Sequence, residues 1–341
     1  MNTTTMSEPV LDVRDLRVWY AGGHNPVRAV DGVSFALRPG EVLGLVGESG
    51  CGKSTLGRGL MGLVPRGAAV DGSITFDGQE LLTMPRRERD RLRGAGMGLI
   101  FQEPMTRLDP LMRINEHFDE AIKTHEKDLS KREREARGLE ALRALGIPPT
   151  RFRNYPHEFS GGMRQRIMIA LALALRPKFI IADEPTTALD VLVEAQILRI
   201  LTEIRERYSP AILLITHNLG IVAEACDRVA VMYAGRIVEQ GPVRDIFAAP
   251  AHPYTKALLS STISLTTQEL HSIPGAPPDL VAPPPGCRFH PRCEYSMQVC
   301  AQTSPPQFGP QRAECWLLDP SLSDAAKAPL DRAEVSIADE A

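Results

Sequence analysis

The stretch VLGLVGESGCGKST, residues 42–55, decides the fold. Residues 42–46 are uniformly apolar, as expected of a strand buried on both faces. Residues 47–54 fit the spacing G-x-x-x-x-G-K-[ST], and residues 55–64 then read as a helix. A strand, a glycine-rich loop and a helix in this order predict a phosphate-binding loop, in which successive backbone N–H groups point at phosphate oxygens.

Two side chains of this loop carry its chemistry. Lys53 can reach the β- and γ-phosphates of a nucleotide, and the Ser54 hydroxyl can bind Mg²⁺. Cys51 is interpreted as a small residue that fits the turn, with a reactive thiol as the alternative. The residues expected to contact the nucleotide here are Gly47, Ser49, Gly50, Cys51, Gly52, Lys53, Ser54 and Thr55.

Further along the chain, two more apolar runs predict buried strands. They are FIIAD (179–183) and AILLIT (211–216), and a helical pattern at 192–208 separates them. Strands that alternate with helices indicate a parallel α/β sheet, whose ligands gather at the carboxyl ends of the strands. Asp183 and Glu184 stand at one such end and His217 at another. We expect Asp183 to contact Mg²⁺ through water, Glu184 to act as general base on an attacking water, and His217 to contact the γ-phosphate.

Composition limits the class of protein. Of 341 residues, 43% are apolar and 24% are charged, and the net charge is −3. Acids and bases alternate along the helical stretches 85–96 and 126–145, so we expect solvated helical faces and no nucleic-acid partner. The longest apolar run, 167–175, is far shorter than the ~20 residues of a membrane-spanning helix, and no signal peptide is read. A cytosolic protein is therefore expected.

Four of the six cysteines lie in the last fifth of the chain, after a proline-rich stretch (273–286) that predicts a stiff extended linker. Clustered cysteines without an export signal favour metal binding over disulfides. No C-x2-C pair occurs, which weakens a zinc-ribbon interpretation. We predict a [4Fe–4S] cluster, with Zn²⁺ or unligated thiols as alternatives and His290 as a possible substitute ligand. The predicted ligands are Cys287, Cys293, Cys300 and Cys315.

Together these motifs resemble the ATPase subunit of ABC transporters, over about residues 10–270. Gln102, in LIFQEP, matches the Q-loop glutamine, and Asp190, in ALD, matches the D-loop acid. The resemblance implies ATP as the nucleotide, catalytic roles for Glu184, His217 and Gln102, and Mg²⁺ held through Ser54, Gln102 and Asp183. Tyr20, in LRVWY, matches the aromatic residue that stacks on adenine, whereas alternation places Trp19 on the other face.

The stretch FSGGM (159–163) matches the signature motif of the same family. In ABC ATPases each ATP lies between the phosphate-binding loop of one subunit and the signature of another. The resemblance therefore assigns Ser160, Gly161 and Gly162 to the ATP of a partner, where a helix N-terminus can meet the γ-phosphate. The usual motif is LSGGQ. Phe159 and Met163 depart from it, which leaves open how equal the two ATP sites are.

Two later stretches narrow the resemblance. HPYTKALLSS (252–261) and PPGCRFHPRC (284–293) look like the C-terminal extension of oligopeptide, dipeptide and nickel importer ATPases. The resemblance implies a D-type subunit on the cytoplasmic face of the inner membrane, peripheral to it. Its expected partners are a second, non-identical ATPase, two permease subunits and, indirectly, an external solute-binding protein.

Several alternatives remain at this point. The transported solute is predicted to be a peptide, with nickel or another small solute as the alternative. A soluble ABC protein of translation or repair is disfavoured, because there is one cassette and no long coiled-coil insertion. Another P-loop enzyme, such as a GTPase or kinase, is disfavoured by the signature, the D-loop and the histidine.

The predicted fold is an α/β P-loop NTPase core with a parallel sheet, an antiparallel β subdomain, a helical subdomain and a C-terminal cysteine-containing extension. The nucleotide-binding domain is expected at 8–250, with the helical subdomain at about 103–176. The extension is expected at 251–320. The last residues, 321–341, are rich in Ala, Asp and Ser and predict a disordered tail.

Overall fold

The computed structural model describes residues 8–21, 25–100, 108–185, 191–261 and 272–323, with positions 326 and 329, and the backbone alone at 191–193 and 196. The chain divides into two compact units. One contains residues 1–12, 36–42 and 74–215, and the other contains 13–35, 43–73 and 216–341.

The first unit contains a parallel arrangement of strands β6 (Met97–Ile100), β7 (Phe179–Asp183) and β8 (Ala211–Ile215). Every residue of β7 and β8 is buried, as their uninterrupted apolar sequences predict. Helix α6 (Val191–Tyr208) connects these two strands. The strand–helix–strand unit expected from the sequence is therefore confirmed.

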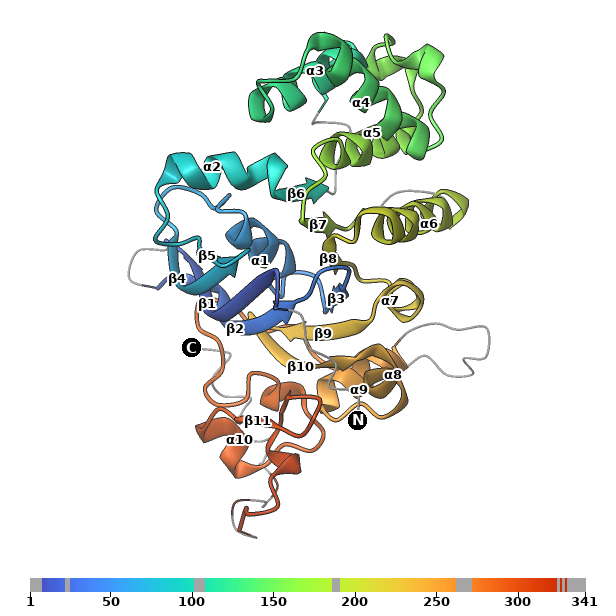
Figure 1. Cartoon of the computed structure of the whole chain (residues 1–341). Coiled ribbons are helices and arrows are strands. Elements are labelled where there is room, and N and C mark those ends of the chain that lie inside the picture. Colours follow the sequence, from blue (N-terminus) through green and yellow to red (C-terminus); the bar gives the residue numbers. More distant parts are fainter. Residues whose placement is uncertain are drawn as a thin grey trace, which may run out of the picture. The chain divides into compact units, whose positions relative to one another are not determined.

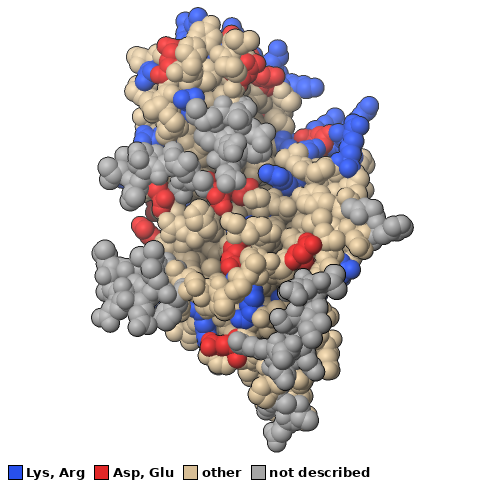
Figure 2. Space-filling model, turned by 180° about the vertical axis from the view of Figure 1, so that it is seen from behind, with Lys and Arg blue, Asp and Glu red and all other residues tan. Residues whose placement is uncertain are grey.

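Three helices of the first unit pack against one another as a helical group, seen together in Figure 1: α3 (Ile114–His125), α4 (Lys131–Ala144) and α5 (Gly161–Leu173). The rings of Phe118 and Phe152 lie 5.6 Å apart within this group. A Cβ at Gly138 would lie 2.8 Å from the Phe152 ring, so the glycine lets α4 come close to its neighbours. The same group carries acidic and basic side chains intermixed on its surface, at the top of Figure 2.

The charged stretches form helices, with one difference from expectation. Helix α4 begins at Ser130, whose hydroxyl accepts a hydrogen bond from the Glu133 N–H at 3.3 Å in a capping box. Helix α2 (Arg86–Ala95) is interrupted, because Arg93 and Gly94 have non-helical backbone angles. The helical pattern at 85–96 therefore does not give one continuous helix.

In the second unit, β3 (Val42–Val46) pairs in parallel with β9 (Arg228–Tyr233), and β9 pairs antiparallel with β10 (Arg236–Pro242). Strand β3 has the bounds that the apolar run predicts. Helix α1 (Lys53–Leu60) follows it and ends earlier than the expected residue 64, since Gly62 adopts a left-handed φ of 62°. The remaining helices here are α7 (Leu219–Ala225), α8 (Val243–Ala248) and α9 (Pro253–Ser260).

A separate four-stranded sheet has the order β2-β1-β4-β5, and β4 and β5 run antiparallel. Its strands alternate buried and more exposed residues, as expected of a sheet with one covered face. The strands are β1 (Leu11–Tyr20), β2 (Val27–Leu37), β4 (Ala69–Phe76) and β5 (Gln79–Glu80).

The C-terminal segment, residues 251–323, joins the core of the second unit. Its proline-rich part, 273–286, contains no helix or strand, but the Leu280 carbonyl accepts a hydrogen bond from the Arg28 N–H of β2 at 2.8 Å. Phe289 and Cys293 are buried in a hydrophobic cluster with Tyr233 and Tyr254. Short elements follow: α10 (Gln298–Gln302) and the pair β11 (Gln307–Phe308) and β12 (Ala313–Glu314).

Candidate nucleotide site

The loop after β3 has a backbone that only glycine fits at two positions. Gly47 has a φ of 153° and Gly52 a φ of 108°. A Cβ at Gly47 would lie 2.1 Å from the Met232 carbonyl oxygen, and one at Gly52 would lie 2.0 Å from that of Ala29. Both glycines are therefore required by the conformation and by the close approach of neighbouring backbone.

Lys53 is held against its own loop. Its side chain is buried, with 7% exposure, and its Nζ donates to the Gly47 carbonyl at 2.7 Å and to the Glu48 carbonyl at 2.9 Å. Helix α1 begins at this lysine, and no side chain caps its first turn. The first N–H groups of a helix have no partner within the helix, so this end can bind an anion.

The loop is also tied to the C-terminal segment, which the sequence did not indicate. The Glu48 N–H donates to the Tyr254 hydroxyl at 2.9 Å. The Glu48 carboxylate receives two hydrogen bonds from the Arg292 guanidinium, at 2.7 and 3.0 Å. The only sequence signal was that Tyr254 and Arg292 belong to the two family-like stretches HPYT and HPRC.

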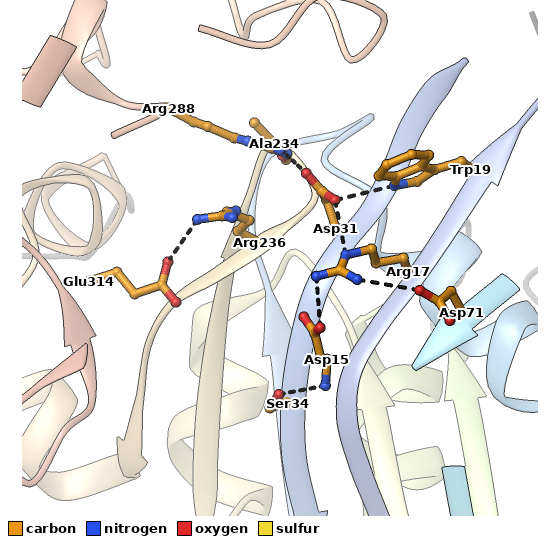
Figure 3. Close-up of polar contacts among 10 residues, drawn as sticks. All are labelled: Asp15, Arg17, Trp19, Asp31, Ser34, Asp71, Ala234, Arg236, Arg288 and Glu314. Carbon is orange, nitrogen blue, oxygen red and sulfur yellow. Dashed lines mark hydrogen bonds and ion pairs between the residues drawn. The ribbon is translucent and has the colours of Figure 1, made fainter. Parts of the chain in front are cut away.

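Tyr20 and Trp19, at the end of β1, have different hydrogen-bond partners. The Tyr20 hydroxyl donates to Thr55 Oγ1 at 3.1 Å, so Tyr20 borders the phosphate-binding loop. Trp19 Nε1 donates to Asp31 Oδ1 at 3.2 Å (Figure 3). The Arg28 guanidinium lies over the Trp19 ring. The placement of the two rings on different faces agrees with the expected alternation.

Cys51 has a structural environment. Its sulfur is buried and lies 3.7 Å from Lys53 Nζ, and its carbonyl accepts a hydrogen bond from the Gly235 N–H at 2.9 Å. Burial raises the pKa of the Cys51 thiol, despite the nearby lysine charge. A neutral thiol is a weak nucleophile, so the interpretation as a small turn residue fits better than a reactive one.

His217 stands where β8 ends, next to the strand that leads into the loop. The Thr216 N–H donates to the Leu45 carbonyl of β3 at 3.2 Å. Asn218 caps helix α7, with Oδ1 accepting from the Gly220 N–H at 3.0 Å. His217 between them is exposed.

In the first unit, β7 ends in the two predicted carboxylates. Asp183 is buried, with 8% exposure, and Glu184 is half-buried. Glu184 has a positive φ of 46°, and its N–H donates to the Ile215 carbonyl of β8 at 2.9 Å. A left-handed backbone at a non-glycine residue costs ~1–2 kcal/mol and is concentrated at functional sites.

The signature stretch begins helix α5, as predicted. Ser160 Oγ accepts a hydrogen bond from the Met163 N–H at 3.4 Å, which makes it the N-cap. Gly161 is exposed, and a Cβ added there would meet no described atom within 4 Å. Its backbone angles are not left-handed either, so neither packing nor conformation in the described chain requires this glycine.

The two departures from the usual signature have local contacts. Phe159 is buried, and the Arg151 guanidinium lies over its ring at 4.5 Å. The same arginine approaches the Met163 sulfur at 3.8 Å. Another residue of this helix, Gln165, was not singled out from the sequence. It is buried, and its Nε2 donates to the Pro185 carbonyl at 2.8 Å, which ties α5 to the chain just after Glu184.

Two predicted site residues, Gln102 and Asp190, lie outside the described residues, as does the predicted tail apart from a few positions. The four clustered cysteines are all described, and Cys293, Cys300 and Cys315 are buried. Burial raises the pKa of Cys287 and Cys293 to about 12 and that of Cys315 to about 11. Among the described residues no group of three or more His, Cys, Asp or Glu is arranged to hold a metal ion. The donor chemistry thus suits a metal, whereas the present arrangement does not.

The described helices include none that combines the length and the apolar character needed to cross a membrane. Within the second unit, Tyr20 contacts the loop and Thr216 contacts the strand that leads into it. Within the first unit the signature helix is tied to the chain just after β7. A glycine loop with its lysine, a strand ending in Asp-Glu and a second helix-opening Ser-Gly-Gly define an ATPase of the ABC class.

Comparisons with known proteins agree. The family described as "ABC transporter" matches residues 30–187, and the family "Oligopeptide/dipeptide transporter, C-terminal region" matches residues 238–300. The oligopeptide transport ATP-binding protein OppD of Salmonella typhimurium is 49% identical over 89% of this chain and 92% of its own length. The dipeptide transport ATP-binding protein DppD of Bacillus subtilis is 47% identical over 92% of this chain and 96% of its own. The chain belongs to the ABC transporter ATP-binding family, in its oligopeptide and dipeptide branch.

Solved structures are similar in the same region. A dimeric, post-hydrolysis state of the ATP-binding cassette MJ0796 with ADP and Pi has a TM-score of 0.62 at 26% identity, over 69% of this chain and 99% of that one. The cbiO1 subunit of Clostridium perfringens, part of the transporter complex cbiONQ, has a TM-score of 0.62 at 29% identity, over 71% and 92%. The predicted fold class, an ABC-type P-loop ATPase, is confirmed.

Proposed function

We propose that this protein is the ATP-hydrolysing subunit of an ABC importer for oligopeptides or dipeptides. The observation that carries the ATPase assignment is the glycine loop, whose buried Lys53 stands at an uncapped helix start. The match of residues 238–300 to the oligopeptide/dipeptide C-terminal region supports a peptide substrate over nickel or another small solute. The relatives are named for peptide transport, which does not favour a soluble ABC protein without a transport role.

The roles of the site residues in this proposal follow their chemistry. Lys53 and the loop N–H groups bind the phosphates, and Ser54 and Asp183 hold Mg²⁺, which neutralises phosphate charge when bound. Glu184 orients a water and accepts its proton, while His217 donates to the γ-phosphate. Tyr20 stacks on the adenine. Gln102 and Asp190 are proposed from the motifs alone, as a Mg²⁺ and water contact and as a nucleotide contact.

The signature is proposed to serve a second chain. Ser160, Gly161 and Gly162 begin α5 with N–H groups that can bind a phosphate. Gly161 supports this role, because nothing in the described chain requires a glycine there and a ligand that approaches the backbone closely would. Each chain would thus hold half of two ATP sites.

The proposed assembly has a second, non-identical ATPase, two permease subunits and an external solute-binding protein that acts indirectly. In it the chain lies at the cytoplasmic face of the membrane as a peripheral subunit. The proposed boundaries stay those of the sequence: a nucleotide-binding domain at 8–250, an extension at 251–320 and a disordered tail at 321–341.

The proposal includes a [4Fe–4S] cluster at the four cysteines, with Zn²⁺ as the alternative. The cluster assignment rests on the four cysteines that occur in one short segment of the chain. No step of ATP hydrolysis depends on it. Iron and zinc analysis of the purified chain, with its visible absorbance, distinguishes the two metals from unligated thiols.

The central test is Glu184→Gln compared with Lys53→Ala. Glu184→Gln should lower ATP hydrolysis by about 10²–10³-fold while nucleotide binding persists, because only the proton acceptor is lost. Lys53→Ala should lose binding itself. Phosphate release and the binding of a fluorescent ATP analogue measure the two effects. Wild-type hydrolysis by the Glu184→Gln variant would refute the assigned base.

A further inference from the structure

The loop residue Glu48 is fixed at three points. Its N–H donates to the Tyr254 hydroxyl, its carboxylate is bound by Arg292, and its carbonyl accepts from Lys53 Nζ. Two of these partners come from the segment that follows the cassette strands, 244 residues away in the case of Arg292. The position of the lysine that binds phosphate is therefore connected through Glu48 to the C-terminal segment.

Arg292 is built into this position. It is 9% exposed, and its Nε donates to the Pro274 carbonyl at 2.7 Å while Nη1 donates to the Tyr233 hydroxyl at 3.3 Å. Both terminal nitrogens bind the two oxygens of Glu48, a bidentate geometry that fixes the carboxylate's orientation. Moving the Arg292 side chain out of this position costs free energy, because each lost hydrogen bond leaves a buried donor unsatisfied.

A carboxylate in this loop poses an electrostatic problem. Glu48 is the second residue of GESGCGKS, so its charge lies in a loop that must receive the negative charges of a nucleotide. Like charges at short range raise the free energy of binding, and the effect grows as water is excluded. The guanidinium of Arg292 neutralises this charge and holds the carboxylate toward Tyr233 and the C-terminal segment.

We propose that Arg292 is a positioning residue for ATP binding, which acts by neutralising Glu48 and holding it in the loop geometry that presents Lys53. The C-terminal segment is then part of the nucleotide site and not only an appendage to it. This inference rests on the proposed function, since it assumes that ATP binds the loop.

The experiment measures the dissociation constant of a fluorescent ATP analogue with the purified full-length chain. Arg292→Gln should raise it about tenfold, because an uncompensated carboxylate remains in the loop. Glu48→Gln alone should change it by less than about threefold. The double variant should bind several-fold more tightly than Arg292→Gln, since the repulsive charge has been removed. The Arg292→Gln defect should also shrink at high ionic strength.

A second ion pair provides the matched control. Arg236 of β10 lies 3.9 Å from Glu314 of β12 and also joins the core to the C-terminal segment, but neither residue belongs to the loop (Figure 3). Arg236→Gln and Glu314→Gln should leave the dissociation constant within about twofold of wild type.

The outcomes separate the two proposals. If the wild-type chain does not bind the analogue, the proposed function fails. If wild type binds and Arg292→Gln binds equally well, the inference alone is wrong. If the double variant is as weak as Arg292→Gln at every salt concentration, Arg292 acts by packing and the neutralising role is refuted.

Discussion

At the scale of single residues, three loop and turn glycines differ in what surrounds them. Gly50 has a φ of 80° and no described atom within 4 Å of an added Cβ, whereas such a Cβ at Gly52 would overlap the Ala29 carbonyl. Both positions carry the left-handed penalty of an L-residue, but only Gly52 adds a steric clash with backbone. Gly78, in the turn between β4 and β5, resembles Gly50 in both respects, with a φ of 78° and open space.

Alanine substitution should separate these positions. Gly50→Ala and the control Gly78→Ala should each lower the free energy of unfolding by ~1–2 kcal/mol. Gly52→Ala should cost at least ~2 kcal/mol more, because β2 or the loop must shift. Urea unfolding of the three variants measures the differences. Equal costs at Gly50 and Gly52 would show that the loop yields easily and that the clash does not matter.

Sequence reasoning found Lys53 and Ser54 because a local spacing defines them. It did not find the contacts of Glu48, since Arg292 and Tyr254 reach it only through the folded chain and no spacing rule connects them. Gln165 was missed for the same reason: its partner is a backbone carbonyl, which has no sequence signature. Local motifs are predictable from one sequence, whereas the residues that position them depend on tertiary contacts.

At the scale of elements, buried strands were predicted better than helix ends. Strands at 42–46, 179–183 and 211–215 have continuous apolar sequences that leave little choice of boundary. Helix α1 was expected to run to residue 64 because apolar residues continue past its end. The chain leaves the helix at Met61 and Gly62, where a left-handed glycine satisfies the last carbonyls.

The N-cap of helix α9 is a buried histidine, His252, with an unusual protonation behaviour. His252 Nδ1 accepts a hydrogen bond from the Tyr254 N–H at 3.0 Å, so the ring caps the helix as a neutral group. The backbone N–H groups of His252 and Ala251 donate to the Glu239 carboxylate, at 3.0 and 2.7 Å respectively. Complete burial lowers the pKa of His252 from 6.5 to about 3.

This cap predicts a pH dependence of stability. Below pH 6.5 His252 becomes protonated in the unfolded chain. In the folded chain it stays neutral down to about pH 3. The free energy of unfolding should therefore fall with decreasing pH in this window, by up to ~1.4 kcal/mol per unit from this residue. His252→Asn keeps a capping acceptor and does not titrate, so its stability should vary less between pH 6.5 and 5. Urea unfolding across this range decides, and parallel pH profiles for the two proteins would contradict the assignment.

At the scale of the whole molecule, the C-terminal segment and the cassette cannot be treated as independent parts. Arg288 binds both Asp31 of β2 and the Ala234 carbonyl, and Asp31 in turn binds Trp19 and Arg17 (Figure 3). Phe289 completes an aromatic cluster with residues of β9 and α9. The sequence predicted a proline-rich linker and an extension whose four cysteines bind a metal. The described contacts join the segment to the core of the second unit, which the cysteine spacing alone did not indicate.

The proposed role of a second chain is tested best at Gly161, because nothing in the described part of the chain requires a glycine there. Gly161→Asp should leave the free energy of unfolding unchanged or raise it by up to ~1 kcal/mol, because an acid at a helix start suits the dipole and replaces a flexible glycine. Ser160→Ala, next to it, should instead cost ~1 kcal/mol through loss of the cap.

ATP hydrolysis should respond differently from stability at this position. In the complex assembled with the proposed second ATPase and permeases, Gly161→Asp should lower hydrolysis at least about 10²-fold, since a carboxylate would meet the partner's γ-phosphate. Binding of the ATP analogue to the isolated chain should stay at the wild-type value, because that site uses the chain's own loop. If the assembled Gly161→Asp complex hydrolyses ATP normally, the signature does not serve the partner's ATP. If the isolated variant unfolds more easily, the glycine has a structural reason that its surroundings do not reveal.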